Sequence, residues 1–410
     1  MTIWTINLYV LIAAVAITAF LAQIRKPKSY FIEILKNFIG SYFIFSGVVK
    51  GIDPAGTGIK MEEYFEIFHE YFPFLNFLWN LFEPISLEFS IFMILLEIVL
   101  GFFLIFGALP KLTSWLIFLT ILFFTFLTGF SHITGKVTDC GCFGDFIKLT
   151  PKVSFIKDAI LVIVLIPLVR NWRSITPLFP VKPRFLALFI LTILATVFTL
   201  RNVYYEPLVD FRAYKVGVNI TECLALPKDA KPYIYENIFI YKNNKTGENH
   251  EFKVENLPTD WENWTFVDRE DKLIQKGDDP KCKDFAISDT NGSDLTDTYM
   301  TEEQPIFALI IPDIRKTNQE SLAEIKELLD AAVKDGHYAI ALTGSSISTV
   351  EEALSKAGIR VDVFNVDATP LKTIMRSNPG ILVLKKGTIL AKHHYNDHVT
   401  YKQLKEALSL

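Results

Sequence analysis

The chain has 410 residues, of which 50% are hydrophobic and 35 are phenylalanine, a composition too apolar for one soluble domain. A formal net charge of -4 and the lack of clustered lysine and arginine argue against a nucleic-acid partner. The long apolar runs are confined almost entirely to residues 1–201. We therefore expect a membrane-embedded half followed by a soluble half.

Six segments are long and apolar enough to predict membrane spans, since a helix needs about 20 apolar residues to cross the hydrocarbon core. They are residues 3–22, 31–50, 86–108, 112–131, 153–170 and 185–201. The fifth segment contains Lys157 and Asp158 near its start and Pro167 near its end, so a re-entrant segment is the alternative there. Because the first run lacks a basic region and a cleavage site, we expect it to be a retained anchor.

Basic residues mark the loops that follow the first, third and fifth of these segments, namely Arg25, Lys26, Lys28, Lys111, Arg170, Arg173, Lys182 and Arg184. The positive-inside rule assigns these loops to the cytoplasm. The loop at 132–152 and everything after Arg201 then lie on the opposite side. We expect a multi-pass protein of a bacterial inner membrane with its C-terminal half in the oxidising periplasm.

Three polar residues of the membrane half are candidates for function. Glu97 lies within the third span, where a charge needs a partner or a role. It is either functional, as a proton relay or a polar group that faces a bound headgroup, or a packed, protonated acid. Lys50 lies where the second span ends, and we expect it to snorkel. His132 is a candidate base or metal ligand near Cys140, and an interfacial histidine without such a role is the alternative.

The most informative motif is the run DCGCFGD at residues 139–145, between two apolar stretches. A disulfide between Cys140 and Cys142 would close a ring too small to constrain an unfolded chain, and Gly141 allows unusual backbone angles. Strained, exposed disulfides exchange readily, which favours redox chemistry. One alternative is metal binding by both cysteines and His132, a set compatible with Cu(I) or with a zinc site that lacks its fourth ligand. The other alternative is a purely structural loop.

The run GSYFIFSGVVK at residues 40–50, followed by Glu97 and Gly101, is similar to the DoxX-like four-helix membrane proteins over about residues 30–170. The Cys-Gly-Cys-Phe-Gly motif resembles the MauE branch, which is associated with disulfide formation during methylamine dehydrogenase maturation. The DoxX superfamily also includes quinone-linked thiosulfate oxidation subunits. More distantly analogous four-helix oxidases pass electrons from thiols to a membrane quinone, but they use Cys-x-x-Cys, and this chain has Cys-x-Cys.

After about residue 202 the sequence changes to short strands and turns. The alternating run at 233–241, the turn at 243–247 and a second strand near 250–255 indicate a β-rich segment. A βα alternation follows, with strands at 305–311, 337–342, 360–365, 380–385 and 388–394 and helices at 318–334, 347–356, 369–376 and 399–408. This order, βαβ units followed by an antiparallel hairpin and a final helix, is thioredoxin-like.

The run from Asn378 through Pro379 resembles the proline-plus-hairpin element of thioredoxins, and Asp284-Phe285 resembles the entry of the TlpA and peroxiredoxin branch. The resemblance implies that Pro379 is cis and shapes a peptide-binding edge. Where that family places Cys-x-x-Cys, this chain has PDIR at residues 312–315. The domain is therefore expected to bind or position a partner rather than exchange disulfides.

Cys223 and Cys282 lie in the half that we expect in the oxidising compartment. A structural disulfide between them would close a loop of about 60 residues and contribute roughly 4 kcal/mol in the chain-entropy model. Two buried thiols are the alternative.

The sequence thus predicts an all-α membrane bundle at 1–201, a β-rich segment at 202–280 and an α/β thioredoxin-like domain at 281–410. The first hypothesis is a thiol-disulfide oxidoreductase in which Cys140 and Cys142 take electrons from a periplasmic thiol protein and pass them to a quinone, with Glu97 or His132 assisting proton movement. A non-catalytic envelope scaffold that binds a protein partner is the second. A subunit of a sulfur-compound:quinone oxidoreductase is the third, and membrane lipid surrounds the bundle in each.

Overall fold

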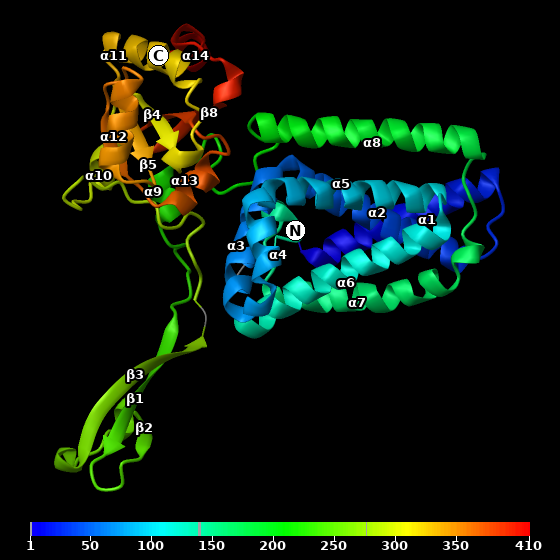
Figure 1. Cartoon of the computed structure of the whole chain (residues 1–410), viewed down its shortest axis with the longest axis horizontal. Helices are drawn as coiled ribbons and strands as arrows, with labels where there is room; N and C mark the ends of the chain where they lie inside the picture. The colour runs from blue at the N-terminus through cyan, green and yellow to red at the C-terminus, as the bar shows by residue number, and fades with distance from the viewer. Residues whose placement is uncertain (1, 138–140, 276) are drawn as a thin grey trace.

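The computed structural model describes residues 2–137, 141–275 and 277–410, which form a helical bundle, a mixed α/β domain at one end of it and a projecting β arm (Figure 1). The helices of the bundle are α1 (Ile3–Ile24), α2 (Tyr30–Ile52), α3 (Pro54–Tyr71), α4 (Asn76–Phe82), α5 (Ser86–Phe106), α6 (Pro110–Thr134), α7 (Pro151–Arg170) and α8 (Val181–Tyr204). The N-terminal half is therefore all-helical, as its apolar runs predict.

Among the described residues, five helical segments are long and apolar enough to cross a membrane, namely α1, α2, the stretch Pro73–Phe106 that ends in α5, α6 and α8. The fifth predicted span is α7, a helix of 20 residues that lies along α6 (Figure 1). It carries more charge than the other five, because it includes Lys157 and Asp158. The chain has the helices of a multi-pass membrane protein, and α7 belongs to the same bundle.

Helices α3 and α4 were not predicted, because the acidic residues of α3 make it too polar for a span and α4, with 7 residues, is too short for one. Asp53 caps α3 by accepting a hydrogen bond from the Gly56 backbone N–H (3.0 Å), and Pro54 fits the first helical position. Phe65 and Phe68 of α3 pack against Trp79 of α4. The two helices therefore form an aromatic-rich cover over one end of the bundle.

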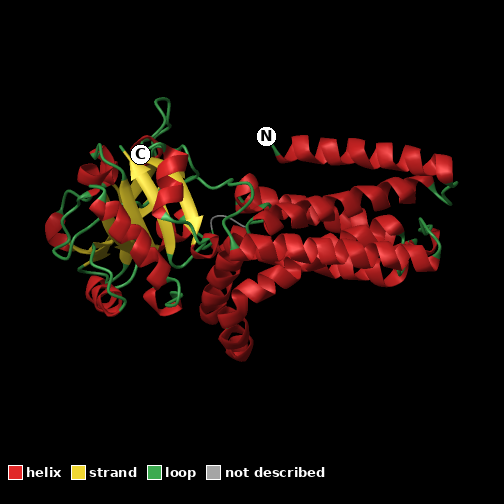
Figure 2. Ribbon diagram, turned by 90° about the horizontal axis from the view of Figure 1, so that it is seen from above, coloured by secondary structure: helices red, strands yellow, loops and turns green. Residues whose placement is uncertain are grey.

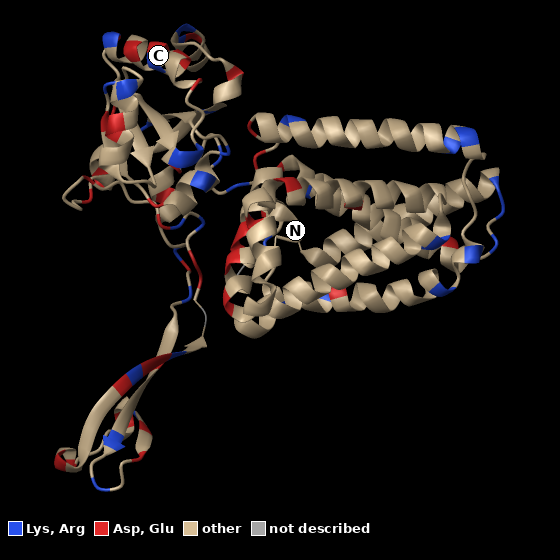
Figure 3. Ribbon diagram, in the orientation of Figure 1, with Lys and Arg blue, Asp and Glu red and all other residues tan. Residues whose placement is uncertain are grey.

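Charge is divided between the two ends of the bundle. Lysine and arginine gather where α1 meets α2 and where α7 leads to α8. Acidic residues lie along α3, at the opposite end of the bundle (Figure 3). The C-terminal half of the chain lies at the α3 end (Figure 1). The basic loops and the C-terminal half are thus at opposite ends, which is the arrangement that the positive-inside argument requires.

The C-terminal domain contains a five-stranded sheet flanked by helices on both faces (Figure 2). Its strands are β4 (Ile306–Ile311), β5 (Tyr338–Thr343), β6 (Asp362–Asn365), β7 (Gly380–Lys385) and β8 (Thr388–His394), in the order β6-β5-β4-β7-β8. The first three are parallel, and β7 and β8 are antiparallel to their neighbours. The helices are α9 (Ile220–Leu224), α10 (Thr296–Thr301), α11 (Leu322–Lys334), α12 (Ile347–Lys356), α13 (Ala368–Ile374) and α14 (Tyr401–Leu408).

Central strand β4 is buried along its whole length, as expected for a strand covered on both faces. Ile306, Ala308 and Ile310 belong to one apolar cluster and Phe307, Leu309 and Ile311 to the other, on opposite faces of the sheet. The predicted strands and helices of residues 305–408 are present with bounds shifted by a few residues. Helices α9 and α10 were not predicted.

Two covalent features of the C-terminal domain coincide with residues singled out in the sequence. Cys223 of α9 and Cys282 form a disulfide with a Cα–Cα distance of 5.1 Å, and both belong to the domain core. The bond between Asn378 and Pro379 is cis. The disulfide joins α9 to the segment that re-enters the domain after the β arm.

The β arm is a three-stranded antiparallel sheet in the order β2-β1-β3, with β1 at Ile234–Asn243, β2 at Asn249–Lys253 and β3 at Trp264–Gln275. It projects away from both the bundle and the domain (Figure 1). The two segments that connect the arm to the domain lie side by side, since Asp278 donates its backbone N–H to the carbonyl of Lys231 at 2.9 Å. The arm corresponds to the predicted β-rich segment, to which the structure adds the long strand β3.

Candidate functional site

The loop that follows α6 brings Cys142 to the end of the bundle. Phe143 anchors this loop, because its side chain is fully buried and its ring meets those of Tyr42 and Phe45, each at 5.8 Å between centroids. Ser46 of α2 donates a hydrogen bond to the Cys142 carbonyl at 3.4 Å. Gly141 has a φ of +61°, a left-handed conformation that favours glycine. The backbone conformation at position 141 therefore explains why a glycine lies between the two cysteines.

Two pockets meet at Cys142. The first, with an empty volume of about 490 Å³ that includes its open mouth, has a largely apolar wall that includes Met61, Met93 and Leu127. The second, of about 330 Å³, extends between α2, α6 and α7. Both are lined by the same four side chains, Lys50, Glu97, Phe124 and Cys142. The cysteine is thus next to an apolar space that also contains buried charges.

Lys50 and Glu97 form a buried ion pair within the bundle, with 2.5 Å between Nζ and Oε1. Their side chains are 7% and 2% exposed, and the ammonium also lies 4.3 Å from the centre of the Phe124 ring. The expectation that Lys50 snorkels to the surface is therefore wrong. Glu97 lies close enough to neutralise the ammonium within the bundle, which removes the need to reach water.

Glycines explain why α2 and α5 approach closely enough for this pair. A Cβ at Gly47 would lie 2.6 Å from the Ile98 side chain, and one at Gly101 would lie 2.7 Å from the Gly40 carbonyl. Small residues of this kind let helix backbones pack tightly in membranes. Gly40, Gly47 and Gly101 therefore place Lys50 opposite Glu97.

A second buried ion pair lies on α7, on the other side of Cys142. Lys157 and Asp158 are 2.8 Å apart, and their side chains are 10% and 4% exposed. The Lys157 ammonium lies 5.1 Å from the centre of the Phe143 ring, and Thr128 donates a hydrogen bond to Asp158 at 3.2 Å. Both charged side chains line the second pocket with Cys142. Sequence reasoning treated them only as an interruption of a span, although two adjacent charges in an apolar run are a signal of function.

The structure brings together two of the predicted catalytic residues, Cys142 and Glu97, which line the same pockets. His132 lies at the end of α6 with an exposed side chain and stacks on Phe155 at 6.2 Å, and it lines neither pocket. Cys140 lies outside the described residues. Within the described part of the chain, no group of three or more His, Cys, Asp or Glu residues could hold a metal ion.

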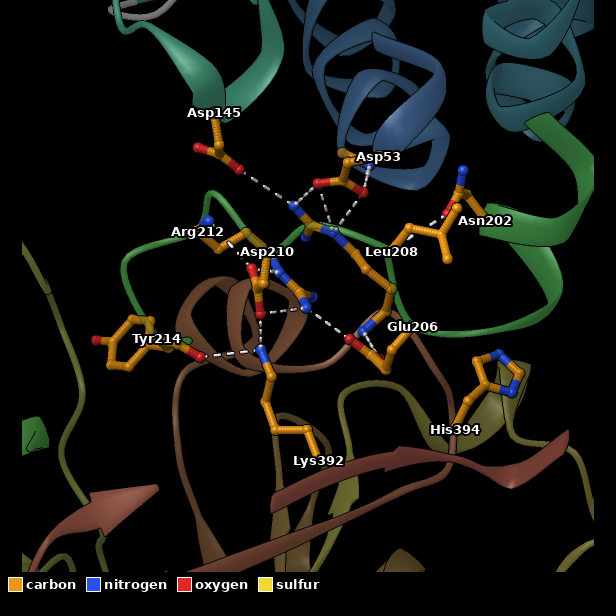
Figure 4. Close-up of polar contacts among 12 residues, drawn as sticks. Asp53, Asp145, Asn202, Glu206, Leu208, Asp210, Arg212, Tyr214, Lys392 and His394 are labelled. Atoms are coloured by element: carbon orange, nitrogen blue, oxygen red, sulfur yellow. Dashed lines mark hydrogen bonds and ion pairs between the residues drawn. The ribbon is translucent and has the colours of Figure 1, made fainter. Parts of the chain in front are cut away.

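A network of charged residues joins the C-terminal domain to the bundle near this loop (Figure 4). Arg376, in the segment after α13, contacts both carboxylate oxygens of Asp53 at 2.7–3.1 Å and lies 3.5 Å from Asp145. Its backbone N–H donates to Glu206 at 2.9 Å. Burial by itself would raise the pKa of Asp53, but the Arg376 guanidinium outweighs it and holds that pKa below its usual range. The Arg376–Asp53 contact therefore favours the charged carboxylate.

The segment after α8 carries the rest of the network (Figure 4). Arg212 is 2% exposed and contacts Glu206 at 2.5 Å and Asp210 at 2.7 Å. Lys392 of β8 pairs with Asp210 and donates to the Tyr214 carbonyl at 2.9 Å. Burial, aided by the Arg212 charge, lowers the pKa of Lys392 to about 8 despite the neighbouring carboxylates. No local motif in the sequence signals this network.

The segment 312–315 and the residues before Pro379 lie next to each other in the C-terminal domain. The Asn378 side chain donates to the Asp313 carbonyl at 2.6 Å, and the Thr317 hydroxyl donates to the Asn378 side-chain oxygen at 2.9 Å. Lys316, in the same loop, pairs with Glu62 of α3 at 3.3 Å. This face of the domain is therefore turned toward the bundle.

Comparisons with known proteins match two parts of the chain. A family model described as methylamine utilisation protein MauE matches residues 28–171, which contain α2 to α7, both pockets and Cys142. A domain of unknown function (DUF8463) matches residues 235–276, which form most of the β arm. No curated protein and no solved structure matches the chain. Residues 28–171 of the bundle are thus similar to the MauE family, and the described part of the chain has the apolar helices of a multi-pass membrane protein.

Proposed function

We propose that this chain is a membrane thiol-disulfide oxidoreductase whose reactive groups are Cys140 and Cys142. The position of Cys142 carries the proposal, because a cysteine anchored by Phe143 at the end of an apolar bundle lines two pockets that contain buried charges. The match of residues 28–171 to methylamine utilisation proteins supports a role as a membrane accessory protein in that process. The orientation that the basic loops favour would place the cysteine pair in the periplasm.

Lys157 is the residue we propose to favour the thiolate of Cys142. A thiolate is the reactive form of cysteine, and a nearby cation stabilises it. The Lys157 side chain lines the second pocket with Cys142 and lies over the Phe143 ring. It replaces His132 as the candidate activating residue, since His132 lies outside both pockets.

The proposed reaction begins with the disulfide form of the Cys140–Cys142 pair. A thiolate of the client protein attacks one of the two sulfurs, a mixed disulfide forms, and the other loop cysteine leaves as a thiolate. A second client thiolate then attacks the client sulfur of the mixed disulfide and releases the loop cysteine. The client gains a disulfide, and the loop gains two electrons and, after protonation, two thiols.

We further propose that the loop thiols are reoxidised by a membrane quinone, which accepts two electrons and two protons. The first pocket suits an apolar ring, because its wall contains Met61, Met93 and Leu127 and it lies within the bundle. Glu97 and Lys50 line the same pocket and are placed to hold and pass the protons released by the thiols. A pocket of mainly apolar walls with few polar groups is typical of small-molecule sites.

The strand order, the cis bond before Pro379 and the neighbouring 312–318 loop support a thioredoxin-like fold for the C-terminal domain. Without cysteines at 312–315, that domain cannot exchange disulfides at the position that thioredoxins use.

Trapping the mixed disulfide tests the proposal. A Cys142→Ser variant and a Cys140→Ser variant each leave one loop cysteine, so at least one of them should form an adduct with the disulfide form of the client. The remaining loop thiolate attacks that disulfide, one client sulfur leaves as a thiolate, and a reductant should release the adduct. A Cys223→Ser, Cys282→Ser double variant is the matched control, since it removes a cysteine pair from the domain core and keeps the loop pair. If neither loop variant forms an adduct and both support normal growth on methylamine, the redox function is wrong.

A further inference from the structure

Arg376 of the C-terminal domain reaches the Cys142 loop. Its guanidinium donates three hydrogen bonds to Asp53 and lies 3.5 Å from Asp145, and the side chain is only 6% exposed. Asp145 follows Cys142 by a few residues in the same loop. Asp53 ends α2, the helix whose Ser46 holds the Cys142 carbonyl and whose Lys50 lines both pockets. Arg376 therefore contacts both the reactive loop, at Asp145, and the end of the helix that supports the loop, at Asp53.

A second contact reinforces the same connection. Phe146 of the loop meets Phe211 at 4.9 Å, edge to face, and Phe211 lies in the segment that leads from α8 to the C-terminal domain. On the bundle side, Phe143 is buried against α2. The loop is thus held on the bundle side by Phe143, and on the side of the C-terminal domain by Asp145 and Phe146.

The face of the domain that makes these contacts is the one formed by the 312–318 loop and the residues before Pro379. Lys316 and Lys372 lie 3.3 and 4.0 Å from Glu62 of α3, and Arg376 lies beside them. The basic side chains of the domain thus meet acidic side chains of the bundle across one interface. This charge complementarity explains why this face is turned toward the bundle and not toward solvent.

We propose that Arg376 is a positioning residue for the Cys142 loop, through which docking of the C-terminal domain controls access to the cysteine. The inference rests on the proposed function only in taking this loop as the reactive site. The docked domain holds the loop closed over the first pocket, and release of Arg376 frees Asp145 and exposes Cys142. The domain then acts on the redox loop of its own chain, and the covered face is unavailable to a client.

Thiol labelling of the full chain tests the inference. In a Cys140→Ser background under non-reducing conditions, a polyethylene-glycol maleimide should label Cys142 about tenfold or more faster when Arg376 is replaced by alanine, because removing one partner of a buried ion pair leaves the other uncompensated. Arg315→Ala is the matched control: it removes an arginine from the same face whose side chain is 84% exposed, and labelling should not change.

A charge exchange keeps the test independent of folding. The double variant Asp53→Arg, Arg376→Asp restores an opposite-charge pair and should bring the labelling rate back toward that of the unaltered chain, while each single variant stays fast. The rescue separates a positioning role from loss of the domain. The inference is overturned if Arg376→Ala leaves the rate unchanged, or if the exchange variant labels as fast as the single variants. Labelling needs neither client nor quinone, so an inactive cysteine pair would leave this result intact.

Discussion

Replacing Glu97 by glutamine removes the charge that balances Lys50 in the interior of the bundle. The two groups are 2.5 Å apart and almost fully buried. At an effective dielectric constant of about 20, their attraction is about 7 kcal/mol, part of which offsets the cost of removing both charges from water. Loss of one partner from a buried pair typically costs about 3–5 kcal/mol, and we expect Glu97→Gln to lower the free energy of unfolding by this amount. Denaturant titration in detergent micelles, followed by tryptophan fluorescence, measures it.

The double variant Lys50→Met, Glu97→Met removes both charges and should recover most of that loss, since apolar side chains of similar size replace buried pairs at little cost. Because it also removes the proposed proton-carrying groups, this stable variant should still reduce quinone poorly. Glu352→Gln is the control, as it breaks an exposed pair with Lys356 and should leave unfolding unchanged. A small effect of Glu97→Gln, or a double variant as unstable as the single one, would refute the reasoning.

Four further outcomes are expected. Cys223→Ser should lower the stability of the C-terminal domain by roughly 4 kcal/mol in a urea titration, because its disulfide joins residues separated by 59 positions. Phe143→Ala should cost about 3–5 kcal/mol by the same measurement in detergent, since it empties the site of a fully buried ring. The pKa of Lys392, about 8, lies below its value in an unfolded chain, so stability should rise between about pH 8 and pH 10.5, and the Lys392→Met variant should lack this rise in urea titrations at both pH values. Replacing the arm at 234–275 by a short glycine-serine linker should leave the thermal unfolding of the rest unchanged, since the arm projects freely and its two connections run side by side.

The helices of the bundle could be predicted because length and hydrophobicity alone decide whether a segment spans a membrane. The sheet of the C-terminal domain was equally accessible, since strands such as Ile306–Ile311 are continuous apolar runs between helical patterns. Helix α3 was missed because its acidic residues mask its aromatic face, and α4 was missed because it has only 7 residues. Local composition was therefore sufficient for most elements.

The site was predictable only in part. The Cys-Gly-Cys motif is local, and it identified the loop that holds Cys142. The pairing of Lys50 with Glu97 depends on how two helices rotate against each other, although the glycines on both helices were a usable signal. The contact between Asp53 and Arg376 joins residues 323 positions apart, and no local pattern encodes it. His132 shows that residues close in sequence need not lie close in space. It is near the cysteines in the chain, but it lines neither pocket.

The most direct test of the account is a single-turnover reaction with a soluble quinone in detergent, using purified protein in which the Cys140–Cys142 pair is reduced and the buried Cys223–Cys282 disulfide is intact. We expect about one quinol per chain to form, with Cys140 and Cys142 joined by a disulfide in the product as read by mass spectrometry. Variants that lack either cysteine should form none. If the loop thiols stay reduced in the presence of excess quinone, the proposed redox function is contradicted.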